Sequence, residues 1–158
     1  MAAPRTYRVE RSTTIDAPPE AVYPHIADFR RWTSWSPWEG LDPDMRRTYS
    51  GADAGVGAVY TWTGNRKAGI GRMAITEARA PSRVVIDLQF EKPFRSRSDT
   101  VFTVEPVGSG SRVTWTMTGP MSLGTRIMSL VRSMDALIGP DFEKGLARLK
   151  LAAETTKR

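Results

Sequence analysis

The chain has 158 residues, 40% of them hydrophobic and 25% charged, which is the composition of an ordinary water-soluble protein and the length of a single domain, here residues 1–158. Because it contains no cysteine, a disulfide framework, a thiolate metal site and a cysteine nucleophile are excluded. The net charge of +6 comes from scattered arginines without a basic helix face, and no apolar run could cross a membrane, so we expect neither nucleic acid nor a membrane span, and we predict a cytoplasmic location.

The N-terminal residues predict a strand followed by short helices. Residues 7–15 alternate as a strand with Val9 and Ile15 on its apolar face, and Arg11 shares the parity of that face. A helix is expected to begin at residues 16–20, where a capping aspartate precedes two prolines in the first turn. Pro24 must shorten or bend this helix, because proline cannot donate a backbone hydrogen bond.

Three of the five tryptophans, Trp32, Trp35 and Trp38, lie within residues 30–43, which we interpret as a loop or a broken helix. Two roles are open for this cluster: a lid over a cavity, or a brace under the first helices. Bracing is the favoured interpretation.

The middle of the chain predicts an antiparallel meander, because alternating apolar segments are separated by hairpin-type turns. The segments cover residues 43–50, 56–63, 70–80, 84–91, 98–106 and 112–119. One parity of these strands is apolar and rich in aromatic residues and methionine: Tyr60, Trp62, Met73, Ile75, Ile86, Leu88, Phe90, Phe102, Val104, Val113, Trp115 and Met117.

A long helix is predicted to follow, from about Leu123 to Ala153, with Gly139 and Pro140 interrupting it. Its apolar stripe includes Met134 and Ile138, and Gly145 on the same stripe would allow a close approach to the sheet. The fold class is therefore α+β. A single helix is only about 10–12 Å across, too narrow to cover a wide curved sheet. The uncovered part of the apolar face is expected to be a hydrophobic cavity.

A small hydrophobic molecule is the expected partner of such a cavity, and no cofactor is expected. The alternative is a filled core. If the cavity is open, Trp115→Ala should change ligand binding while the fold survives. The candidate ligand-binding residues share the inward parity or the helix stripe, and they are Tyr60, Trp62, Met73, Leu88, Phe90, Phe102, Trp115, Met117, Met134 and Ile138.

Catalytic residues cannot be assigned from the sequence. The single histidine, His25, cannot form a dyad, and no cluster of His, Asp and Glu has the spacing of a metal site. General acid–base chemistry by carboxylates is the remaining enzymatic option. Only Glu77 and Asp141 look able to reach the cavity from regular structure; the alternatives are a solvated strand end for Glu77 and dipole stabilisation in a helical first turn for Asp141.

Arg11 and Arg47 also have inward parity, which is unusual for arginine. Either a bulge turns them to water, which is the favoured interpretation, or they enter the cavity and bind an anionic group. A buried guanidinium needs a partner, and Asp141 is one candidate for Arg11.

Several motifs resemble bacterial polyketide cyclase/dehydrase-like proteins of the SRPBCC superfamily. They are Ile15–Val22, Phe29–Trp32, Trp35–Trp38, Tyr49–Gly51, Val56–Ala58, Trp115–Gly119, Ile138–Gly139 and Asp141–Leu146. The resemblance implies a START-like, Bet v 1-like helix-grip fold: a curved antiparallel sheet of about seven strands wrapped around a long C-terminal helix, with two short helices after the first strand.

The family includes lipid carriers, receptors, cyclases and co-chaperones, so two hypotheses stay open. One is a module that binds a small hydrophobic or aromatic ligand, lipid-like or polyketide-like, between the sheet and the helix. The other is a cyclase or dehydratase that uses inward-facing acid–base residues. The oligomeric state is not predicted.

Overall fold

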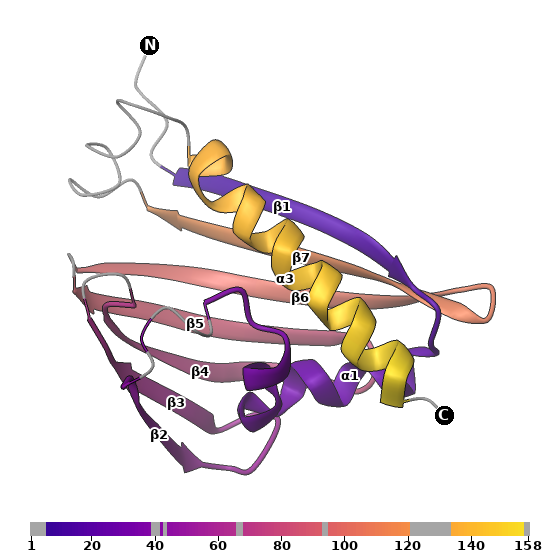
Figure 1. Cartoon of the computed structure of the whole chain (residues 1–158), viewed down its shortest axis with the longest axis horizontal. Coiled ribbons are helices and arrows are strands. Elements are labelled where there is room, and N and C mark those ends of the chain that lie inside the picture. Colours follow the sequence, from indigo (N-terminus) through magenta and orange to yellow (C-terminus); the bar gives the residue numbers. More distant parts are fainter. Residues whose placement is uncertain are drawn as a thin grey trace.

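Seven antiparallel strands form one sheet in the order β1-β7-β6-β5-β4-β3-β2 (Figure 1). The computed structural model describes residues 6–38, 42, 44–65, 68–92, 95–120 and 134–156. The strands are β1 (Thr6–Ile15), β2 (Arg46–Gly51), β3 (Ala58–Thr63), β4 (Ile70–Arg79), β5 (Arg83–Lys92), β6 (Ser96–Val107) and β7 (Gly110–Pro120). The predicted meander is confirmed, and β1 extends it at one edge by pairing with β7.

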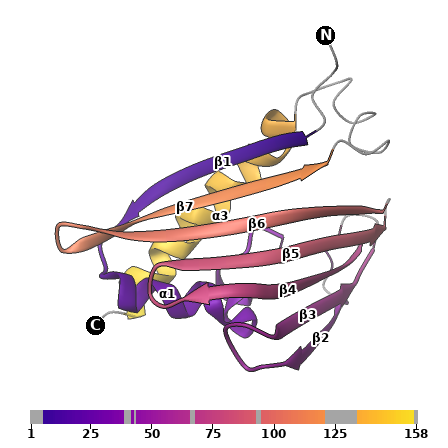
Figure 2. The same ribbon diagram turned by 180° about the vertical axis from the view of Figure 1, so that it is seen from behind.

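Two short helices follow β1, as predicted: α1 (Pro19–Ala27) and the 3-10 helix η1 (Phe29–Ser34). The second begins where the Asp28 side chain accepts a hydrogen bond from the backbone N–H of Arg30, 3.0 Å away, which satisfies one of the free donors at the helix start. These helices lie on the same face of the sheet as the C-terminal helix, as the view from behind also shows (Figure 2).

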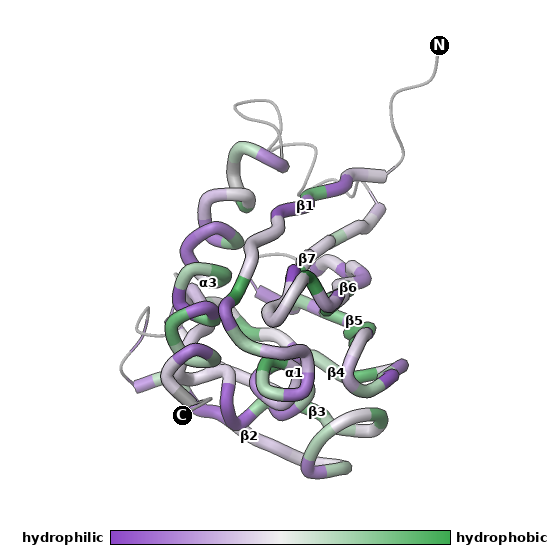
Figure 3. Tube along the Cα trace, turned by 90° about the vertical axis from the view of Figure 1, so that its right-hand side faces the viewer, coloured by the Kyte–Doolittle hydropathy of each residue, from purple (hydrophilic) through white to green (hydrophobic). Residues whose placement is uncertain are grey.

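The C-terminal helix α3 (Met134–Thr156) crosses the sheet over β1 (Figures 1 and 3). The predicted start of the helix near Leu123 lies outside the described residues. The predicted interruption at Gly139 and Pro140 is wrong, because α3 continues through both residues as one helix. Its buried face repeats at helical spacing and consists of Phe142, Leu146, Leu149 and Ala153.

The concave face of the sheet carries the core, because strand alternation places apolar side chains on that side. Val9, Ile86, Phe102, Val104 and Val113 are each at most 2% exposed. The architecture is the helix-grip arrangement that the sequence predicts.

Candidate ligand-binding cavity

A cavity of about 200 Å³ lies between the concave face of the sheet, η1 and α3. It is partly open to solvent. Aromatic and methionine side chains dominate its wall: Phe29, Trp32, Ser36, Trp38, Met45, Tyr49, Tyr60, Trp62, Ala68, Met73, Leu88, Phe90, Met117, Ile138 and Asp141.

Most of the predicted ligand-binding residues lie in this wall. Six come from the strands and one from α3: Tyr60, Trp62, Met73, Leu88, Phe90, Met117 and Ile138. The backbone of Met134 starts α3, but its side chain lies outside the described part of the structure. Phe102 and Trp115 are not part of the wall; they are buried beside it, 0% and 2% exposed.

Phe102 and Trp115 belong instead to an aromatic stack that fills the space next to the cavity. The ring of Trp115 lies parallel to that of Phe142, with centroids 4.0 Å apart and an interplanar angle of 7°. The ring of Phe102 also stacks with that of Trp115, with centroids 4.9 Å apart. The filled core and the open cavity, which the sequence leaves as alternatives, are therefore both present in different parts of the same apolar face.

The tryptophan cluster braces the short helices, and two of its members also line the cavity. The indole nitrogen of Trp32 donates a hydrogen bond to the carbonyl oxygen of Ile26, and that of Trp35 donates to His25, both at 2.9 Å. These bonds tie η1 and the following turn to α1 while satisfying buried N–H groups. Trp32 and Trp38 contribute to the cavity wall, whereas Trp35 is completely buried.

Several lining residues could not be found from the parity of the predicted strands. Phe29, Trp32, Ser36 and Trp38 come from η1 and the turn after it, where side-chain direction follows no period-two rule. Tyr49 could have been found, because β2 pairs in register with β3 and places Tyr49 opposite Tyr60. Tyr49 has the same strand parity as Arg47, whose inward parity the sequence analysis recognises, so Tyr49 could have been assigned to the inner face as well.

Asp141 is the acidic side chain that reaches the cavity wall, as predicted. Glu77 does not reach it, and the predicted inward direction is wrong. A register shift between Ile75 and Glu77 reverses the alternation, so Glu77 lies opposite Val85 on the outer face. There its carboxylate accepts a hydrogen bond from the Nε of Arg83 at 2.6 Å, which lowers the pKa of Glu77.

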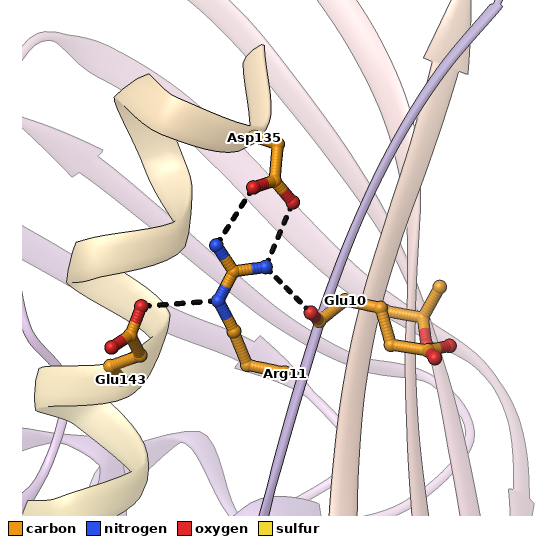
Figure 4. A network of polar contacts seen from close by, with 5 residues as sticks. Glu10, Arg11, Asp135 and Glu143 are labelled. Carbon is orange, nitrogen blue, oxygen red and sulfur yellow. Dashed lines mark hydrogen bonds and ion pairs between the residues drawn. The ribbon is translucent and has the colours of Figure 1, made fainter. Parts of the chain in front are cut away.

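Arg11 points towards α3 and not into the cavity (Figure 4). Two of its guanidinium nitrogens each donate to one carboxylate oxygen of Asp135 at 2.8 Å, and its Nε donates to Glu143 at 3.1 Å. Nη1 also donates to the backbone carbonyl oxygen of Glu10 at 2.8 Å, which is the fourth hydrogen bond of this guanidinium. Both carboxylates favour the charged guanidinium and so raise the pKa of Arg11, while the guanidinium lowers the pKa of Asp135.

Two expectations about Arg11 are therefore wrong. The register of β1 with β7 is unbroken, so no bulge turns the side chain away from α3. The partner is not Asp141 but the pair Asp135 and Glu143. Gly139 makes this contact possible, because a Cβ atom there would lie 2.2 Å from Nη2 of Arg11.

We expect Arg11→Met to lower the melting temperature, because it removes the ion pairs that join β1 to α3. Arg8→Met is the matched control: Arg8 pairs with Glu10 of its own strand at 2.6 Å and, among the described residues, forms no ion pair with a second element. Melting curves of both variants at low salt and at 1 M NaCl measure the effect. The loss in Arg11→Met should shrink at high salt, where screening acts within about 3 Å. Equal melting temperatures for the two variants would contradict the assignment.

Two other residues that the sequence analysis considers, His25 and Arg47, lie outside the cavity wall. His25 is buried, and its burial, together with the charge of Arg31, lowers its pKa. Arg47 has the inward parity that the sequence predicts and lies opposite Trp62 in the β2–β3 register. Within the described residues, no group of three or more His, Cys, Asp and Glu side chains could hold a metal ion. None of the described helices is long and apolar enough to span a membrane.

This arrangement of sheet, helix and cavity has a counterpart in known families. Residues 6–154 match the family described as polyketide cyclase / dehydrase and lipid transport. The chain belongs to this family. The resemblance to SRPBCC-type proteins that the motifs indicate is thereby confirmed. No curated protein matches the chain by sequence.

Several solved structures share the fold. Protein MLL2253 from Mesorhizobium loti superposes with a TM-score of 0.67 at 17% identity, covering 96% of this chain and 98% of that one. DynU16, from the dynemicin biosynthetic locus, gives 0.62 at 17% identity, covering 94% of this chain and 47% of that one. The Bet v 1-like protein Ara h 8.0201 gives 0.57 at 13% identity, covering 95% and 96%.

Proposed function

We propose that this protein binds a small aromatic or otherwise apolar molecule in the cavity between the sheet and α3. The observation that carries the proposal is the cavity itself: about 200 Å³ of space remains beside a tightly stacked aromatic core. Methionine adapts to ligands of irregular shape, and Met45, Met73 and Met117 all contribute to the wall. Membership of a family that includes lipid transport supports the proposal.

The volume limits the size of the ligand. An apolar cavity of about 150 Å³ is large enough for benzene, whereas drug-sized ligands occupy pockets of about 300–1,000 Å³. At about 200 Å³, this cavity accommodates a body of one or two aromatic rings. A longer lipid-like or polyketide-like chain would have to extend through the open side.

Filling the cavity tests the proposal. Leu88 is 7% exposed and lies in the wall on the central strand β5, so Leu88→Trp should occupy the space and abolish binding of small aromatic probes such as 2-phenylethanol. Val85→Trp is the matched control, because Val85 lies on the same strand but with the opposite parity. Calorimetric titration of both variants and the parent measures binding, and circular dichroism checks that they are folded.

At one hundred times its dissociation constant, a probe should stabilise the parent by about 2.7 kcal/mol. Leu88→Trp should lose this stabilisation and Val85→Trp should retain it. Equal probe binding by Leu88→Trp and the parent would place the binding elsewhere, and no binding by the parent would contradict the proposal.

The enzymatic alternative, a cyclase or dehydratase, has one specific observation in its favour. Asp141 brings a carboxylate into the cavity wall, where it could act as a general acid or base. Liquid chromatography with mass spectrometry of a ligand recovered after incubation separates the two functions. A carrier returns the molecule unchanged, a dehydratase returns it lighter by one water, and a cyclase that removes no water returns an isomer of equal mass with a different retention time.

A further inference from the structure

Asp141 is the one side chain with a formal charge among the described residues of the cavity wall. Most of the remaining wall is aromatic or aliphatic. Asp141 is half-buried, and a carboxylate beside apolar side chains attracts a cationic group more strongly than a carboxylate in open water does. The wall therefore favours a ligand that carries a group able to pair with a carboxylate.

The position of Asp141 in α3 is not explained by the helix dipole. An aspartate stabilises a helix when it lies in the first turn, where the positive end of the helix dipole is found. The helix α3 runs from Met134 without interruption, and the acidic residue of its first turn is Asp135. Asp141 lies more than one turn further along, so the interpretation as a first-turn residue does not hold.

The helix instead turns Asp141 towards the ligand space. Ile138 lies three residues earlier on the same side of α3 and also lines the cavity, whereas the neighbouring residue Phe142 is buried in the aromatic stack. Arg11, a basic side chain that contacts α3, is occupied by Asp135 and Glu143.

The aromatic residues of the wall suit a cation as well as an apolar group. Tyr60 and Trp62 stack with centroids 5.6 Å apart, and Tyr49 lies beside Tyr60 at 5.2 Å. Tyr49 already accepts a cation, since the guanidinium carbon of Arg30 lies 4.9 Å from its ring centroid. A cation over an aromatic ring is attracted to the negative face of the ring.

We propose that the ligand is an amine: an aromatic body of one or two rings whose protonated amino group pairs with Asp141. This inference rests on the proposed function, because it concerns the same cavity. A carboxylic acid, including a fatty acid, would bring a second negative charge to Asp141 and is disfavoured. A neutral alcohol would donate a hydrogen bond to Asp141 from an uncharged hydroxyl group. Such a bond is weaker than one from an ammonium group.

Three probes of nearly equal shape test the inference: 2-phenylethylamine, 2-phenylethanol and phenylacetate. Calorimetric titration at pH 7 should show the amine binding roughly ten- to hundred-fold more tightly than the alcohol, and phenylacetate binding most weakly. The net charge of +6 attracts anions to the protein as a whole, so a preference for the amine has to come from a local group.

Asp141→Asn should reduce amine binding to about the level of the alcohol and so remove the preference for the amine. Asp99→Asn, on the exposed outer side of β6, is the matched control and should retain the preference. If Asp141→Asn does not fold, the order of affinities in the parent still decides, and Asp141→Ser provides a second variant.

The outcomes separate this inference from the proposed function. Binding of the alcohol as tight as that of the amine, or an amine preference that survives Asp141→Asn, would overturn the amine assignment while the binding function stands. Failure of all three probes to bind the parent would overturn both.

Discussion

Replacing Trp115 with alanine should lower the free energy of unfolding by about 3–5 kcal/mol, the usual cost of truncating a buried large aromatic residue. Trp115 is 2% exposed and stacks against Phe142 at 4.0 Å and Phe102 at 4.9 Å. Alanine would leave a void between β7, β6 and α3. Urea denaturation followed by circular dichroism measures the loss.

The comparison with Trp115→Phe gives this experiment its control, because phenylalanine keeps a ring in the stack and should cost much less. The sequence predicts that the fold survives Trp115→Ala and that ligand binding changes. The buried stack adds to that prediction a large loss of stability. An alanine variant within about 1 kcal/mol of the parent, less than the range for such truncations, would show that the stack contributes little.

Gly145→Ala should destabilise the protein by about 1–3 kcal/mol through overpacking, although alanine favours a helix over glycine by up to about 1 kcal/mol. A Cβ atom at position 145 would lie 2.8 Å from Cδ of Pro37 and 2.9 Å from Cζ3 of Trp115. Both neighbours are rigid rings, so α3 itself would have to move away from the sheet. Thermal and urea denaturation measure the change.

Gly139→Ala in the same helix provides the matched comparison. Its added Cβ would meet the guanidinium of Arg11, the far end of a flexible side chain that can move aside. The loss at position 139 should therefore be smaller than at position 145. A stabilised Gly145→Ala variant would show that helix propensity outweighs the contact with the sheet.

The parity of the strands predicted the larger part of the cavity wall. Leu88 and Met117 lie where alternation from a single apolar face places them, because their strands pair without irregularity at those positions. The same rule failed at Glu77, where a register shift reversed the alternation. No residue in this part of the sequence indicates that shift. Local irregularity is therefore what limits this kind of prediction.

Strand parity does not determine whether an inward side chain lines the cavity or packs in the filled core. Trp115 and Met117 share a face of β7, yet only Met117 lines the cavity, because the rings of Phe142 and Trp38 pack against Trp115. That packing depends on where α3 crosses the sheet. The crossing is a tertiary contact that strand parity does not encode. The only sequence signal for it is Gly145 on the predicted helix stripe, which permits a close approach to the sheet.

The open sheet ends, among the described strands, in two edges, and both carry arginine. β2 is a short strand of six residues that begins with Arg46 and Arg47, and β1 carries Arg8 and Arg11. An exposed edge offers unpaired backbone groups to a strand of another molecule, and short edge strands and charged side chains discourage such pairing. The arginines of these two edge strands thus disfavour edge-to-edge aggregation of a protein of this topology.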